Sequence, residues 1–109
     1  MEPSILQRLM DVIEDRRANP PERSYTSQLF RGGVPKIGSK ILEEAREVVE
    51  AANEAEDAGR QHLIHEAADL IYHLFVMLGH CNVRLPEVEA ELVRRFGVSG
   101  LDEKAARPS

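Results

Sequence analysis

The sequence predicts an all-α protein made of one helical bundle of four to five helices. Its 109 residues suffice for one domain. Aromatic residues make up only 5% of the chain, and no long run of alternating β-branched residues indicates a strand. Apolar residues instead recur at intervals of three and four, the spacing of one helix face. We therefore expect a single domain over residues 1–109.

The first helix is expected to begin after Ser4, a residue type that caps helix N-termini. Its apolar positions are Ile5, Leu6, Leu9, Val12 and Ile13. It should end before Asn19, because Pro20 and Pro21 follow and the residue before a proline disfavours helical backbone.

Residues 18–34 are expected to form a long connection punctuated by Pro20, Pro21, Gly32 and Gly33. Ordered loops of this length are uncommon and often functional. The composition is equally compatible with a flexible linker.

The second helix is expected to begin at Pro35, which suits a first helical turn, and to end within residues 53–59. One apolar stripe runs along it: Ile37, Ile41, Ala45, Val48 and Ala52.

The third helix should run from about Gln61 to His80. Its apolar stripe is too wide for one small domain to cover: Leu63, Ile64, Ala67, Leu70, Ile71, Leu74, Phe75 and Leu78. A helix that is apolar around most of its circumference is buried. We therefore expect burial against a second subunit.

A fourth helix should open at Pro86 and turn four residues inward: Val88, Leu92, Val93 and Phe96. Residues 97–109 have little apolar surface to bury, so we expect this tail to become ordered only on contact with a partner.

The net charge of −5 is unevenly distributed along the chain. Residues 1–40 carry +2, residues 41–69 carry −7, and residues 70–109 are neutral. Net acidity argues against a protein that binds nucleic acid by neutralising phosphates. It does not argue against binding phosphates through a metal ion.

The sequence indicates neither insertion into a membrane nor secretion. Cys81 is the only cysteine, the N-terminal residues are charged throughout, and the longest apolar stretch is too short to span a bilayer. We expect a cytoplasmic protein.

Two acidic pairs with a spacing of three dominate the −7 block. Glu44 and Glu47 lie at the edge of the apolar stripe of the second helix, with Glu43 beside Glu47; Glu66 and Asp69 lie likewise on the third. Packing of the two stripes would bring these edges together. Facing carboxylates repel, and a hard divalent cation such as Mg²⁺ or Mn²⁺ removes the repulsion.

Other interpretations of these residues are open. Acidic residues on helices usually form a solvated face, and His73 is compatible with a buried core histidine. A di-iron centre needs Glu-x-x-His pairs, which this chain lacks at its acidic positions. His62 and His65 have the spacing of a soft-metal pair, but surface histidines are the more common case.

Five segments together resemble the phosphoribosyl-ATP pyrophosphohydrolase family, within the wider MazG-like nucleoside triphosphate pyrophosphohydrolases. They are SYTSQLF (24–30), KI (36–37), EEAREV (43–48), EAADLIYHL (66–74) and SGLDEKA (99–105). The acidic pattern is shared by the wider group, whereas the first, fourth and fifth segments are specific to the narrower family.

The resemblance implies a MazG-like fold completed by dimerisation, as a homodimer or higher homo-oligomer. It implies Mg²⁺-dependent hydrolysis of phosphoribosyl-ATP to phosphoribosyl-AMP and pyrophosphate, the second step of histidine biosynthesis. It implies four metal ligands, Glu44, Glu47, Glu66 and Asp69, with Glu43 as a further ligand or neighbour. The chain has no length for the cyclohydrolase domain to which this domain is often fused.

The basic residues of the first 40 positions are candidate phosphate contacts: Arg16, Arg17, Arg31, Lys36 and Lys40. Ser24, Tyr25 and Thr26 are candidate contacts to the ribose or a phosphate. His73, four residues after Asp69, is a candidate either to orient Asp69 or to contact substrate. Two positions depart from the family's usual sequence: Ser39 stands in place of a lysine and Leu42 in place of a glycine before Glu43.

Two other functions share some of these features. A MazG-like house-cleaning enzyme that hydrolyses non-standard nucleoside triphosphates would share the acidic site. A non-enzymatic helical dimerisation module would use the acidic residues as a docking surface and would not be stabilised by metal.

Overall fold

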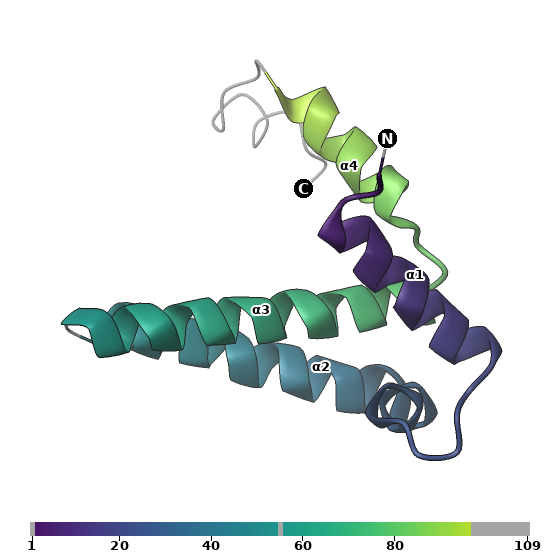
Figure 1. Ribbon diagram of the computed structural model, residues 1–109, viewed down its shortest axis with the longest axis horizontal. Helices are drawn as coiled ribbons and strands as arrows, with labels where there is room; N and C mark the ends of the chain where they lie inside the picture. Colours follow the sequence, from purple (N-terminus) through teal and green to yellow (C-terminus); the bar gives the residue numbers. More distant parts are fainter. Residues whose placement is uncertain (1, 55, 97–109) are drawn as a thin grey trace, which may run out of the picture.

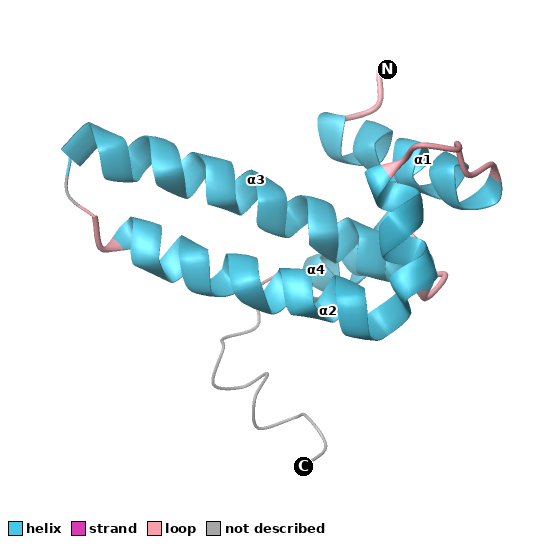
Figure 2. Cartoon of the chain, turned by 90° about the horizontal axis from the view of Figure 1, so that it is seen from below, coloured by secondary structure: helices cyan, strands magenta, loops and turns pink. Residues whose placement is uncertain are grey.

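The computed structural model describes residues 2–54 and 56–96, and this part of the chain contains four helices and no strand. They are α1 (Ile5–Ala18), α2 (Tyr25–Ala52), α3 (Glu56–His80) and α4 (Leu85–Arg95). The all-α prediction is confirmed (Figure 2). The long helices α2 and α3 form an antiparallel hairpin, and α1 and α4 project from one end of it (Figure 1).

Helix α1 begins as predicted. The Ser4 Oγ accepts a hydrogen bond from the Gln7 N–H at 3.1 Å, which satisfies one of the amides that a helix start leaves free. The buried side is carried by Met10 and Ile13. Ile5 is 71% exposed, so the first turn does not contribute to the core as the periodicity predicted.

The prediction of a connection over residues 18–34 is wrong, because α2 already begins at Tyr25. Ser24 caps it, its Oγ accepting from the Ser27 N–H at 3.2 Å. Only residues 19–24 connect α1 to α2. The glycines that indicated a loop mark a kink instead: Gly33 has φ 68° and ψ −163°, a region that only glycine adopts readily.

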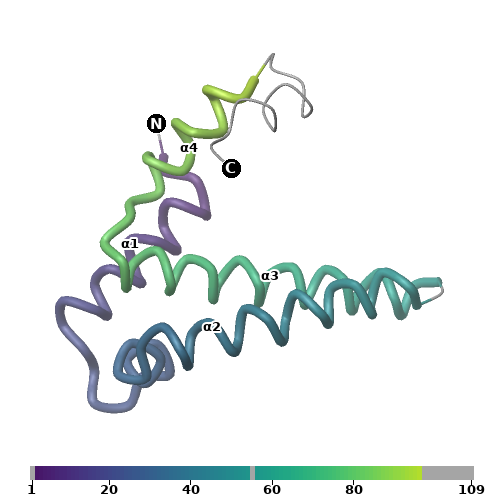
Figure 3. The backbone as a smooth tube through the Cα atoms, turned by 180° about the vertical axis from the view of Figure 1, so that it is seen from behind, coloured from purple at the N-terminus to yellow at the C-terminus, as the bar shows by residue number. Residues whose placement is uncertain are grey.

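The kink divides α2 into two segments that run in different directions (Figure 3). Pro35 stands at the start of the second segment, where its fixed φ and missing N–H are harmless. The predicted start of a helix at Pro35 is therefore correct for this segment, and the predicted end near Asn53 is also confirmed.

One hydrophobic core joins the first three helices and the first residue of α4 at the end of the hairpin where α1 packs. Its buried members are Met10, Ile13, Leu29, Ile37, Phe75, Val76 and Leu85. Helices α1 and α3 meet closely at Gly79, where a Cβ would lie 3.2 Å from Cγ2 of Ile13. Leu29 shows that the segment before the kink is part of this core.

Helix α4 departs from prediction. Leu85 is buried and Pro86 lies in the first turn as expected, but Leu92, Val93 and Phe96 are 52–76% exposed rather than inward. Helix α4 makes no extensive contact with another described helix. On α3, which starts at Glu56 rather than Gln61, Ile64, Ile71 and Leu74 also remain exposed. The predicted tail at residues 97–109 lies outside the described residues.

None of the four described helices combines the length and apolar character needed to span a bilayer.

Candidate active site

Helices α2 and α3 bring the predicted carboxylates to their shared side. Glu44 and Glu66 are buried, with 7% and 6% of their surface exposed. Glu47 and Asp69 are half-buried. Ionised carboxylates are almost never this deeply buried unless a partner compensates for the lost water.

The four carboxylates interact with one another. A hydrogen bond with Glu47, with further contributions from burial and from the charges of Glu47 and Asp69, raises the pKa of Glu66 above its ordinary value. Burial raises the pKa of Glu44, and the negative charge of Asp69 adds to the effect while His73 opposes it. Glu44, Glu47, Glu66 and Asp69 are called the carboxylate cluster below.

His73 lies buried against the cluster. Its Nδ1 lies 2.9 Å from the Asp69 carbonyl oxygen and 2.5 Å from Oε1 of Glu44. Since both neighbours are acceptors, Nδ1 carries a proton, which it donates to the Asp69 carbonyl. The Nε2 atom lies 2.9 Å from the Tyr25 hydroxyl.

The first turn of α2 therefore reaches the cluster through His73. Tyr25 stacks on Tyr72 with ring centroids 6.4 Å apart, and Thr26 Oγ1 hydrogen-bonds the Tyr72 hydroxyl. Burial raises the pKa of Tyr25, against the opposing charge of Lys40. Tyr72 was not among the predicted site residues, although it directly precedes His73.

Ser24 and Thr26 have roles within the protein. The Ser24 hydroxyl is buried and caps α2, and the Thr26 hydroxyl bonds Tyr72. These two hydrogen bonds fix the first turn of α2. Ser24 and Thr26 thereby hold Tyr25 in place beside His73.

Lys40 and Glu43 lie at the rim of the cluster. The Lys40 Nζ lies 3.3 Å from Oε2 of Glu43, and this hydrogen bond raises the pKa of Lys40. Glu43 is exposed, and it acts electrostatically on Glu44. Leu42, the departure from the family pattern, is 73% exposed and displaces nothing in the core.

The other predicted cations lie on α1, as Arg16 and Arg17 do, or within three residues of the α2 kink at Gly33, as Arg31 and Lys36 do. The stem of Lys36 covers Gly32, where a Cβ would lie 2.4 Å from the Lys36 Cδ. The Arg17 Nη1 donates to the Gly79 carbonyl at 2.7 Å and to the Asn82 side chain. Arg16 borders a pocket with Arg17.

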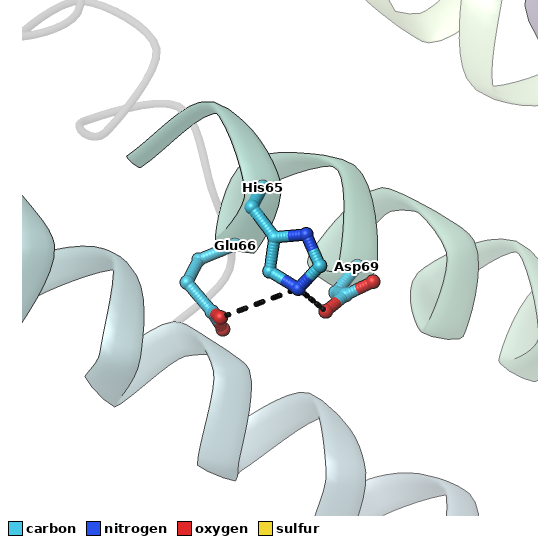
Figure 4. A group of neighbouring side chains, drawn as sticks. All are labelled: His65, Glu66 and Asp69. Atoms are coloured by element: carbon cyan, nitrogen blue, oxygen red, sulfur yellow. Dashed lines mark ion pairs between the residues drawn. The ribbon is translucent and has the colours of Figure 1, made fainter. Parts of the chain in front are cut away.

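His65 is a neighbour that sequence reasoning left as a surface residue. Its Nε2 lies 3.2 Å from Oδ2 of Asp69 and 3.9 Å from Oε1 of Glu66 (Figure 4). The signal in the sequence was its spacing of four before Asp69. His62 pairs with Glu54 at 2.8 Å, and this hydrogen bond raises the pKa of His62. The Nε2 atom of His62 also lies 3.7 Å from Oε1 of Glu66.

The cluster fits a hard divalent cation. The buried atoms Oε1 of Glu44 and Oε2 of Glu66 accept no hydrogen bond, since the N–H of His73 is directed to the Asp69 carbonyl. Buried polar atoms are normally satisfied. Carboxylate oxygens suit Mg²⁺ or Mn²⁺, and the charge of such a cation would offset the repulsion within the cluster. In the described part of the chain, ligand atoms of Glu66 and Asp69, together with His65, lie within 4.8 Å of one another.

Comparison with known proteins gives one consistent family. The profile of the phosphoribosyl-ATP pyrophosphohydrolase family matches residues 6–96. The chain is 55% identical over 104 residues to a phosphoribosyl-ATP pyrophosphatase of Rhodopirellula baltica, covering 95% of this chain and 87% of the relative. It is 46% identical over 107 residues to the protein of that name from Geotalea daltonii, covering 98% of each.

The match spans all four helices, the carboxylate cluster and His73. The chain belongs to the phosphoribosyl-ATP pyrophosphohydrolase family.

Proposed function

We propose that the chain hydrolyses phosphoribosyl-ATP to phosphoribosyl-AMP and pyrophosphate, the second step of histidine biosynthesis. Family membership supports the reaction. The observation that carries it is the pair of buried carboxylates, Glu44 and Glu66, each with an oxygen that accepts no hydrogen bond. A polyphosphate can approach such an acidic site only when a cation accompanies it.

Mg²⁺ is the proposed cation, with Mn²⁺ as a substitute, and Glu44, Glu47, Glu66 and Asp69 would hold it. When bound, it neutralises phosphate charge and lowers the pKa of bound water. Glu43 is proposed to act from the rim through its effect on Glu44 and its pairing with Lys40.

The chain's own residues position the reactants. His73 holds Glu44 from one side and Tyr25 from the other, which fixes the first turn of α2 against the cluster. Lys40 offers positive charge to the phosphates at the rim. Water attacks the α-phosphorus, a carboxylate of the cluster accepts its proton, the bond from the α-phosphorus to the bridging oxygen breaks, and this oxygen leaves on pyrophosphate.

We propose that two chains pack as a homodimer or within a larger homo-oligomer. Ile64, Ile71 and Leu74 remain exposed along α3, and Phe96, which directly follows α4, is 76% exposed. The Cα radius of gyration is 16.3 Å, against about 13 Å for one compact domain of this length. A second copy would cover this apolar surface. We also propose a cytoplasmic location, which fits a member of a biosynthetic enzyme family with a single cysteine.

The test is pyrophosphate release by the purified chain with Mg²⁺ from phosphoribosyl-ATP and from a panel of standard and non-standard nucleoside triphosphates. Preference for phosphoribosyl-ATP supports the proposal. Preference for a non-standard triphosphate would assign the chain a house-cleaning role, and absence of both turnover and metal binding would favour a dimerisation module.

A further inference from the structure

A pocket of about 310 Å³ lies between α1 and the first turns of α2, and it includes no residue of the carboxylate cluster. Six residues line it: Arg16, Arg17, Pro20, Ser27, Phe30 and Arg31. Three of the six are arginines and none is acidic. The lining of the pocket is therefore positively charged, whereas residues 41–69 carry a net charge of −7.

Two of its arginines have no partner among residues 2–54 and 56–96. Arg17 is held in place by the Gly79 carbonyl and the Asn82 side chain. Arg16 and Arg31 form no ion pair or hydrogen bond with any residue in the described part of the chain. Two unpaired guanidinium groups beside an anchored one favour a multiply charged oxyanion such as a phosphate, because each can donate two parallel hydrogen bonds to a pair of its oxygens.

Ser27 gives an independent indication of a ligand. Its side chain is only 2% exposed, and its Oγ has no hydrogen-bond partner. Its backbone N–H is satisfied by Ser24, so the hydroxyl is the group left over. A buried hydroxyl without a partner is uncommon in proteins, and a ligand oxygen would satisfy it.

The pocket and the carboxylate cluster share one turn of α2. Tyr25, two residues before Ser27, contacts His73 beside Glu44. Residues two apart on a helix point about 160° apart. The first turn of α2 therefore contacts the cluster on one side and the pocket on the other, and its N-terminal amides add positive potential between them.

We propose that this pocket binds the phosphate monoester of the phosphoribosyl group, the end of the substrate away from the triphosphate. The inference rests on the proposed function and deepens it. Arg16, Arg31 and Ser27 then distinguish phosphoribosyl-ATP from nucleoside triphosphates, which have no second anionic end. The carboxylate cluster alone does not make this distinction.

The first test compares two substrates: phosphoribosyl-ATP and the same compound with its phosphate monoester removed. For the wild-type chain, removal of the monoester should raise KM about tenfold or more. Arg31→Gln and Arg16→Gln should each raise KM for phosphoribosyl-ATP by a similar factor, with kcat nearly unchanged, because the interaction is equal in ground and transition states. Neither variant should change KM for the truncated compound.

Arg60→Gln is the matched control. Arg60 is an exposed residue of α3 outside the pocket, and its substitution removes the same charge. It should leave both KM values within about twofold, because salt screens a distant exposed charge. If KM for phosphoribosyl-ATP rose equally in Arg60→Gln and Arg31→Gln, the rise would come from the loss of net charge alone, and the proposal would be overturned.

Ser27→Ala separates a ligand contact from a structural one. Alanine favours the helix and removes an unsatisfied hydroxyl, so the melting temperature should not fall. KM for phosphoribosyl-ATP should nevertheless rise severalfold. A lower melting temperature with an unchanged KM would assign the hydroxyl to the fold and contradict the proposal.

Inorganic phosphate tests whether the anion that binds the pocket belongs to the substrate or to a separate effector. It should inhibit turnover of phosphoribosyl-ATP competitively, and Arg31→Gln should weaken this inhibition about tenfold. Non-competitive inhibition would indicate a separate phosphorylated effector and overturn the proposed subsite. If the wild-type chain releases no pyrophosphate, the proposed function fails; if it does and substrate discrimination survives in Arg31→Gln, only the subsite fails.

Discussion

His73 Nδ1 lies 2.5 Å from Oε1 of Glu44, and this contact joins the middle of α3 to the middle of α2 inside the protein. The positive potential of the imidazole opposes the rise in the pKa of Glu44 that burial causes. His73 is thereby the immediate neighbour that makes an ionised Glu44 tolerable before any metal binds.

His73→Phe should lower the free energy of unfolding by about 1–3 kcal/mol at pH 7.5, because a buried carboxylate loses its compensating neighbour. Tyr25→Phe, which removes one partly exposed hydrogen bond, should cost about 0.5–1.5 kcal/mol. Urea unfolding of both variants measures the difference. Equal stability of His73→Phe and the wild-type chain would show that Glu44 does not depend on the imidazole.

Glu47→Gln and Asp69→Asn should each lower kcat for pyrophosphate release by about a hundredfold or more, because each removes a proposed metal ligand. Glu50→Gln is the control, since Glu50 is exposed on the same helix and pairs with Arg46. Full activity in both cluster variants would show that the site is wrongly assigned.

Mg²⁺ should stabilise the protein more at pH 7.5 than at pH 5. The pKa values of Glu44 and Glu66 are raised in the folded chain above their ordinary value of 4.5. A carboxyl whose pKa is raised by folding favours the folded state at low pH, and this contribution is lost as pH rises through the folded pKa.

Melting temperatures with and without Mg²⁺ at the two pH values test this relationship. Metal at a hundred times its Kd adds about 2.7 kcal/mol to the stability of a protein that binds it only when folded. The metal-free protein should melt at a higher temperature in Glu66→Gln than in the wild-type chain at pH 7.5. A Mg²⁺ effect that is equal at both pH values would contradict the electrostatic account.

Gly33→Ala should destabilise the protein by about 1–3 kcal/mol, because alanine does not adopt φ 68° and ψ −163° without strain. Space is not the reason, since a Cβ at this position would meet nothing closer than 3.8 Å. Gly38→Ala is the matched control within the same helix. Its Cβ would make only an ordinary contact with Met77 at 3.8 Å, so helix propensity should stabilise it by about 0.5–1 kcal/mol.

Thermal unfolding of the two glycine variants should therefore shift in opposite directions. Activity of Gly33→Ala should also fall, because the kink sets the position of Tyr25. Identical shifts for both variants would indicate that the kink is not required.

Ile71→Glu and Leu74→Glu should convert the proposed oligomer to monomer, because each places a charge on the exposed apolar side of α3. Sedimentation measures the mass of the assembly. A wild-type chain that sediments as a monomer would contradict the proposed dimer.

The sequence predicted those parts of the fold that local rules determine. Ser4 and Asn19 bound α1 because capping and proline chemistry act over a few residues. The two carboxylate pairs were placed correctly relative to the apolar stripes, since a spacing of three on each helix fixes their common face.

Other parts depended on information that one chain does not carry locally. Gly32, Gly33 and Pro35 are typical of a loop, so the helix before them was missed; the core contact of Leu29 decides its conformation. Periodicity placed Leu92 and Phe96 on one face of α4 but did not tell whether this chain or another copy covers it. The role of Ser24 as a cap followed from its three-dimensional position.

The kink at Gly33 brings two residues of α2 that are far apart in sequence close together in space. Tyr25 and Glu44 are 19 positions apart in α2, a separation of about 28 Å along a straight helix at 1.5 Å per residue. Both nevertheless touch the same imidazole ring, on its two nitrogen atoms. One residue without a side chain thus allows a single helix to fold back and approach the same ring twice, as two separate helices would.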